Sequence, residues 1–225
     1  MTQAEEMIAA VKARDAARVQ ALLQQEPALA ATPTDDGSLL LTAVYYGAGE
    51  AAALIRRYLR DLTVWEAATV GDLDRLATLL EQEASLANAP GPGGMRPLHL
   101  AAFFRQTEAV RLLLARGADP LRYGLYQQPF VPRNTALHAA LAGGAWEAAR
   151  LLVEAGANVH AVDSEGLVPL HNAAFAGHIP SAELLLAHGA EVNVPDKNRE
   201  TPLTKAVKQG KTECADFLRQ HGAVE

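Results

Sequence analysis

Hydrophobic and small residues recur along the chain in short blocks that alternate with polar turns. The block RPLHLAA from Arg96 and the block VPLHNAA from Val168 place leucine and alanine at helical spacing. A second apolar block follows each of them and ends at a glycine, as in ARLLVEAG, which ends at Gly156. Glycine is favoured just past a helix end, where the backbone φ is often positive. The pattern predicts pairs of short helices joined by tight turns.

These two motifs repeat in the same register. The leucines of the first motif are evenly spaced apart from one longer first interval, and the glycines that end the second motif keep the same intervals, including the longer one. Such a period is typical of repeat proteins, in which each unit buries its apolar face against its neighbours. The positions concerned are Leu98, Leu137, Leu170 and Leu203, and Gly117, Gly156, Gly189 and Gly222.

The 33-residue period and openings such as TPLTKAV from Thr201 resemble the ankyrin repeat, a unit of one β-turn and two helices. The resemblance implies an all-α fold, an α solenoid of about seven helix-turn-helix units with short β-hairpin turns. We expect residues 1–225 to form a single domain. Its expected parts are degenerate repeats at 1–60, a degenerate third repeat at 61–92, regular repeats at 93–195 and a C-terminal cap at 196–225 that carries Lys205, Lys208 and Lys211 on its outer surface.

Two stretches depart from the regular period. Gly47 and Gly71 are closer together than one full repeat, so we expect one helix pair to follow the other there without a full hairpin. The longer interval follows Asp119 and falls within the aromatic segment 121–133. This segment has no helical period and contains two prolines, which predicts an enlarged hairpin or loop projecting from the stack.

The resemblance also implies where a partner binds. In the family the first helices line a concave face, and the two residues before the glycine that follows each first helix vary with the partner. We expect at least two of Tyr45, Tyr46, Phe103 and Phe175 to be exposed. Phe104 is the candidate most suited to internal packing, because Arg105 replaces the usual glycine beside it. The full set of candidate partner-binding residues on the concave face and the loop is Tyr45, Tyr46, Phe103, Phe104, Leu141, Phe175, Tyr123, Tyr126 and Phe130.

Composition narrows the possible partners. The formal net charge of −6 argues against nucleic-acid binding and against docking on anionic membranes, since both need a basic face. The single cysteine, Cys214, cannot form an intramolecular disulfide and is expected to be a buried small residue. With no secretory or membrane-spanning segment visible, we expect a cytoplasmic monomer. The excess of arginine over lysine and the abundance of alanine favour a bacterial source.

Residues that could carry chemistry are few. The resemblance gives His99, His138 and His171 a structural role as hydrogen-bonding residues of the turns. The sequence has no serine nucleophile elbow and no His-Glu-x-x-His motif, and we expect no catalytic residue, no cofactor and no metal. The expected function is therefore a non-catalytic module that binds an unidentified protein through its concave face and hairpin tips.

Two alternatives remain open. The chain could be a small-molecule binder or an enzyme that uses the 121–133 loop as a lid over Gln106, Arg122 and Arg133, because loops longer than a repeat needs are often functional. It could also be an exported effector that engages the proteins of a host, which composition does not distinguish from a housekeeping role.

Overall fold

The computed structural model describes residues 2–91, 94–124 and 134–224, and the α-helices found there form seven successive pairs with no strand among them. The predicted all-α solenoid is confirmed. The first helices of the pairs are α1 (Gln3–Lys12), α3 (Leu39–Tyr45), α5 (Val64–Val70), α7 (Pro97–Phe103), α9 (Ala136–Ala142), α11 (Pro169–Ala176) and α13 (Pro202–Lys208). The second helices are α2 (Ala16–Gln25), α4 (Gly49–Tyr58), α6 (Leu73–Gln82), α8 (Thr107–Ala115), α10 (Trp146–Glu154), α12 (Ile179–Ala187) and α14 (Thr212–Gln220), and the 3-10 helices are η1 (Pro27–Ala31) and η2 (Ala84–Asn88).

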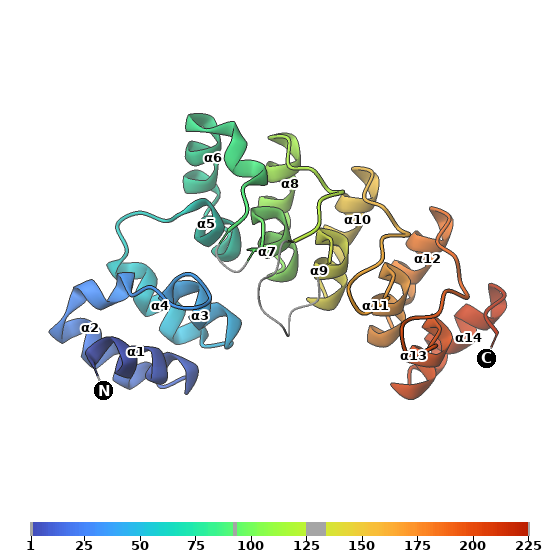
Figure 1. Cartoon of the computed structure of the whole chain (residues 1–225), viewed down its shortest axis with the longest axis horizontal. Coiled ribbons are helices and arrows are strands. Elements are labelled where there is room, and N and C mark those ends of the chain that lie inside the picture. Colours follow the sequence, from blue (N-terminus) through green and yellow to red (C-terminus); the bar gives the residue numbers. More distant parts are fainter. Residues whose placement is uncertain (1, 92–93, 125–133, 225) are drawn as a thin grey trace.

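The helix pairs stack into an arch (Figure 1). From α5 to α14 the first helices lie along the inner side of the arch and the second helices along the outer side. Helix α4 ends at Tyr58 and α5 begins at Val64, so this junction has no hairpin, as the short spacing predicts. The helices α1–α4 turn away from the rest of the stack at this junction (Figure 1).

Each first helix ends in a turn that needs a positive φ. Glycine supplies it after most first helices, for example Gly71 with φ of 73°. Arginine takes this position at Arg14 and at Arg105, where φ is 58° and 62°. L residues adopt this conformation at a cost, so its presence at arginine shows that the packing of the pair dictates the turn.

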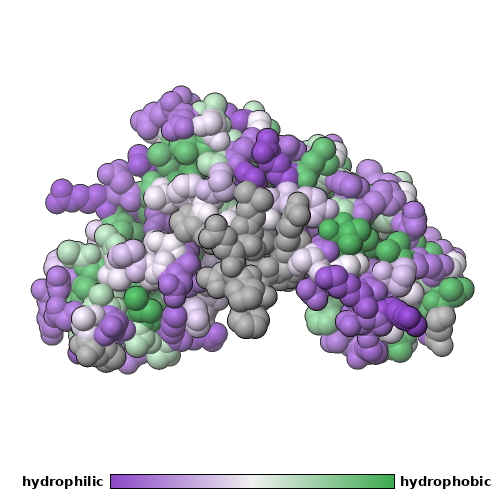
Figure 2. Space-filling model, viewed as in Figure 1, coloured by the Kyte–Doolittle hydropathy of each residue, from purple (hydrophilic) through white to green (hydrophobic). Residues whose placement is uncertain are grey.

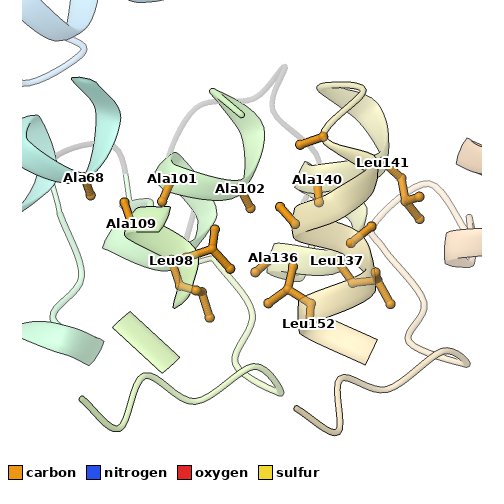
Figure 3. Close-up of a cluster of buried hydrophobic side chains, with 14 of the residues drawn as sticks. Ala68, Leu98, Ala101, Ala102, Ala109, Ala136, Leu137, Ala140, Leu141 and Leu152 are labelled. Carbon is orange, nitrogen blue, oxygen red and sulfur yellow. The ribbon is translucent and has the colours of Figure 1, made fainter. Parts of the chain in front are cut away.

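Alanine lines the seams between neighbouring repeats. Ala101 and Ala102 of α7 and Ala136 and Ala140 of α9 are fully buried. Figure 3 shows these small side chains along α7 and α9, with the larger leucines beside and below them. Because alanine extends little from the backbone, the helices approach closely and each pair buries its apolar face against the next.

Buried histidines join each repeat to the next. Nε2 of His99 lies 3.2 Å from the carbonyl oxygen of Asn134. The equivalent atoms of His138 and His171 lie 3.0 Å from the carbonyl oxygens of Leu167 and Glu200. Burial lowers the pKa of all three rings, that of His99 to about 4, so they are neutral near pH 7 and donate through Nε2. The predicted structural role of these histidines is confirmed.

Tight hairpin turns connect the regular repeats. In one of them the amide of Asp163 donates to the carbonyl oxygen of Leu167 at 2.9 Å, and its carboxylate accepts two backbone N–H groups. The predicted enlarged hairpin begins in the same way. Tyr123 and Thr135 form an antiparallel bridge, and the amide of Gly124 donates to the carbonyl oxygen of Asn134 at 2.9 Å. The rest of that segment, with Tyr126 and Phe130, lies outside the described residues.

Candidate binding groove

The residues that precede the turn after each first helix form a row along the concave face. Three aromatic side chains of this row are exposed, namely Phe175 (54%), Tyr46 (40%) and Tyr45 (36%). Phe103 and Phe104 are half-buried. The expectation that at least two of the four aromatic candidates are exposed is confirmed.

At the N-terminal end of the row the aromatic residues contact one another. The rings of Tyr45 and Phe104 meet edge to face with centroids 5.4 Å apart, and Phe104 meets Phe103 in the same way at 5.1 Å. The Tyr45 hydroxyl donates to the sulfur of Met95 at 2.8 Å. Burial of the phenol, aided by the negative charge of Asp36, raises the pKa of Tyr45. This cluster joins α3 to α7 across α5.

Tyr46 is also engaged within the chain. The ammonium of Lys12 lies 5.4 Å from the centre of its ring, in a cation–π contact. Arg14 Nε donates to the backbone carbonyl oxygen of Tyr46 at 2.7 Å. The N-terminal part of the row therefore uses its aromatic side chains to hold helices α1, α3 and α7 together.

The assignment of Leu141 to the exposed row is wrong. The positive φ of this repeat falls at Gly144 (70°), so the two residues before the turn are Ala142 and Gly143. Leu141 lies one residue earlier on α9, is only 2% exposed, and belongs to the buried cluster drawn in Figure 3. Its side chain contributes to the wall of a cavity on the same face.

A cavity of about 600 Å³ opens on the C-terminal part of the concave face, between α9, α11 and α13. We call it the C-terminal hollow. Phe175 and Trp146 supply its largest apolar side chains, and the Trp146 indole stacks on the His178 ring with centroids 4.1 Å apart. The hollow is lined by Leu141, Ala142, Gly143, Gly144, Trp146, Leu167, His171, Asn172, Phe175, Ala176, Glu200, Lys205, Lys208 and Gln209.

One side of the C-terminal hollow is charged. Lys205 Nζ lies 2.7 Å from Asp196 Oδ2 and also pairs with Glu200, which in turn pairs with Lys208. Burial alone would raise the pKa of Asp196, but hydrogen bonds from Lys205 and two backbone amides bring it below its usual value. Hydrogen bonds from both lysines likewise lower the pKa of Glu200. Asp196 and Glu200 are therefore ionised near neutral pH.

Two of the three lysines expected on the outer surface of the C-terminal cap, Lys205 and Lys208, line the C-terminal hollow. The rule that selects the two residues before each turn also selects Lys208 and Gln209, which are polar and so are not among the aromatic candidates. Trp146 is the first residue of α10, the second helix of its pair. The rule for the concave face concerns first helices and does not select Trp146, so only the structure shows that this residue lines the C-terminal hollow.

Two of the three residues proposed to lie beneath a lid have partners elsewhere. Gln106 Nε2 donates to the carbonyl oxygen of Thr69 at 3.1 Å, and Arg122 pairs with Asp119 at 3.3 Å. Arg133 lies outside the described residues. In the described ranges no group of three or more histidine, cysteine or acidic side chains is placed to hold a metal ion. Cys214 is 1% exposed, and burial raises the pKa of its thiol.

The face of the molecule seen in Figure 2 is mixed in character. Figure 2 shows that hydrophobic residues gather in separate patches among hydrophilic ones on the face in view. None of the helices in the described residues combines the length and the apolar character needed to cross a bilayer.

Comparison with known proteins identifies the repeats. Residues 121–196 match the family model described as ankyrin repeats (3 copies), and residues 93–123 match the model of a single ankyrin repeat. Human DNA-binding protein RFXANK is 36% identical over 72 residues, which cover 32% of this chain and 28% of that protein. Ankyrin repeat and SOCS box protein 3 is 33% identical in human and 35% in cattle over 108 residues, or 48% of this chain. These 108 residues span 20% of the length of that relative.

Proposed function

From the ankyrin repeats that occupy residues 93–196, we propose that the chain is a non-catalytic module that binds another protein through its concave face. The observation that carries this proposal is the C-terminal hollow, an apolar cavity of about 600 Å³ beside the exposed ring of Phe175. Exposed aromatic side chains next to a cavity are typical of binding hot spots. The aromatic residues at the N-terminal end already pack together, so we place the main contact at α9, α11 and α13.

The DNA binding named for the relative RFXANK is not part of this proposal. This chain has a formal net charge of −6, and a protein that binds phosphate backbones needs an excess of basic residues to displace counterions. We infer further that the chain is a monomer and that it works in the cytoplasm of a bacterium. The arginine-rich composition supports the bacterial source, and size-exclusion chromatography with light scattering tests the monomer.

Comparative capture tests the concave-face assignment. The full chain and its Phe175→Ala variant are immobilised at equal density, and bound proteins are quantified by mass spectrometry. The control is Leu73→Ala, which removes a side chain of comparable exposure (38%) from α6 on the outer side of the arch. We expect Phe175→Ala to lower the capture of a specific partner at least tenfold, since an aromatic hot spot contributes about 2 kcal/mol or more. Equal capture by all three proteins would refute the assignment.

A further inference from the structure

We propose that the C-terminal hollow takes a peptide segment of a partner protein in which one large apolar side chain is flanked by carboxylates. This inference rests on the proposed function and adds the chemistry of the partner. Three features of the hollow support it, namely the apolar wall, the distribution of cations around its rim and the unpaired polar atom of Asn172.

The apolar wall fits a single anchoring side chain. Phe175 is 54% exposed, and Trp146, Leu141 and Leu167 complete the apolar surface around it. A volume of about 600 Å³ accommodates an aromatic side chain together with part of its own backbone. Burying such a side chain removes about 150–250 Å² from water, which makes aromatic residues effective anchors.

The rim and the adjacent hairpin are rich in cations although the chain as a whole is acidic. Four of the five lysines of the chain lie between positions 197 and 211, and the net charge of the whole chain is −6. The Lys208 side chain is 60% exposed at the rim, and it shares its partner Glu200 with Lys205. Two lysines therefore share this carboxylate, and a carboxylate from a partner can join Lys208 without displacing it.

The hairpin beside the hollow adds to this positive charge. Lys197 and Arg199 are exposed on it, and within the described residues neither forms an ion pair. The acidic residue exposed on the neighbouring hairpin is Glu165, whose carbonyl oxygen accepts the amide of Lys197 at 3.2 Å. The exposed charged side chains of the rim and the two hairpins are thus three cations and one carboxylate, and this balance at the surface favours an acidic segment at the hollow.

The turn before α3, at the opposite end of the array, carries carboxylates. Asp35 and Asp36 lie on the turn before α3, and Lys12 is held over the ring of Tyr46. An acidic segment is thus attracted to the C-terminal end and repelled from the N-terminal turn. The cations beside the hollow and the carboxylates of that turn therefore favour an acidic segment at the C-terminal end.

A polar atom in the wall of the hollow also lacks a partner. Oδ1 of Asn172 is enclosed and accepts no hydrogen bond within the described part of the chain. A buried acceptor without a donor is unfavourable, so a donor brought by a ligand is favoured there. A backbone N–H next to the anchor supplies such a donor once the Asn172 side chain rotates toward the cavity.

Synthetic peptides of defined composition test the proposal. The probes are fluorescein-labelled 11-residue peptides with tryptophan or serine at the centre and with glutamate or lysine at two positions on each side, separated by glycine and serine. Binding to the full chain is measured by fluorescence anisotropy. We expect the tryptophan–glutamate peptide to bind at least tenfold more tightly than both the tryptophan–lysine and the serine–glutamate peptides. Its affinity should fall as salt is added.

Two variants locate the interaction. Lys208→Glu should weaken binding of the tryptophan–glutamate peptide at least tenfold, and Phe175→Ala should remove the preference for tryptophan over serine. The matched control is Lys12→Glu, which makes the same charge change at the N-terminal end of the concave row and should leave binding within twofold.

The remaining outcomes separate this inference from the function on which it rests. Absence of binding by every peptide, equal binding of glutamate and lysine peptides, or an unchanged affinity in Lys208→Glu would each overturn the inference. The proposed function is judged separately by the capture experiment. Loss of capture in Phe175→Ala together with no preference for acidic peptides would leave the concave-face function standing and reject only its acidic chemistry.

Discussion

Replacing Gly143 by alanine should separate α7 from α9. The backbone of Gly143 has φ of −77° and ψ of −6°, which alanine adopts without strain. An added Cβ atom, however, would lie 2.1 Å from the carbonyl oxygen of Phe103, whereas ordinary contact begins at 3.4 Å. The obstacle is backbone, so no side chain can rotate out of the way and the two helices must move apart until ordinary contact is restored.

The energetic cost follows from the seam that this movement opens. Ala102 and Ala136 are fully buried on the facing sides of α7 and α9 (Figure 3), and their contacts weaken when the helices separate. Overpacking of a core costs about 1–3 kcal/mol and sometimes more. We expect Gly143→Ala to lower the free energy of unfolding by about 3 kcal/mol, a large share of the roughly 5–15 kcal/mol typical of folded domains.

Urea unfolding followed by far-UV circular dichroism measures this effect. The matched control is Gly49→Ala at the first residue of α4, where an added Cβ atom would meet nothing within 4 Å. That variant should be more stable than the original chain by about 0.5 kcal/mol, because alanine has the higher helix propensity. A Gly143→Ala variant with the same urea midpoint as the original chain would refute the close-approach argument.

Three further predictions concern buried ionisable groups. The pKa of His99 is lowered to about 4 from its usual 6.5, so the unfolded state binds more protons below pH 6.5, and stability is lost as pH falls. This ring should contribute a loss of about 2 kcal/mol between pH 8 and pH 5, and urea titrations should show that His99→Gln reduces it. Lys205→Met leaves Asp196, which is 7% exposed, without its cation and should cost about 2–3 kcal/mol in urea unfolding, while the exposed control Lys211→Met should change stability by less than about 0.5 kcal/mol. Cys214 should react with a thiol reagent only as fast as the chain opens, and rapid labelling of the native protein would contradict its burial.

The repeat could be predicted from the sequence because its signals are local. Each turn after a first helix needs a positive φ, and the glycine in the sequence indicates the position of the turn at Gly47, Gly71 and Gly177. The register holds even at Arg14 and Arg105, where the surrounding leucine and alanine pattern places the turn and the residue itself gives no sign of it. Local signals repeated at a constant interval are sufficient to determine the order and pairing of the helices.

The error at Leu141 has a simple cause. Two consecutive glycines, Gly143 and Gly144, are both possible positions for the turn. The prediction for Leu141 places the turn at Gly143. In the neighbouring repeats the residue with positive φ follows the motif leucine by seven positions, as Gly177 follows Leu170. The same count from Leu137 reaches Gly144, so the spacing of the motifs predicts the turn at the residue where the structure has it.

Contacts between distant repeats could not be predicted in this way. Tyr45 reaches Met95, which is fifty positions away, because the stack changes direction at the short junction 59–63. The direction of that bend depends on how α3, α5 and α7 pack together, and no local pattern encodes it. The charged side of the C-terminal hollow could not be predicted from local patterns either. Lys205 contacts Asp196 only after the last hairpin folds back on α13.

The last helix pair should be needed for the solubility of the array. Ending the chain at residue 195 removes α13 and α14, against which α11 and α12 pack. The buried His171 would lose the carbonyl oxygen of Glu200 as its acceptor, and an unpaired buried donor costs about 1–3 kcal/mol. Because the stability of a repeat array is close to a sum over adjacent interfaces, the uncovered apolar face has no other repeat to protect it. We expect the truncated chain to aggregate in size-exclusion chromatography at concentrations where the full chain elutes as a single species. A soluble truncated monomer with unchanged helical content would show that residues 196–225 do not act as a cap.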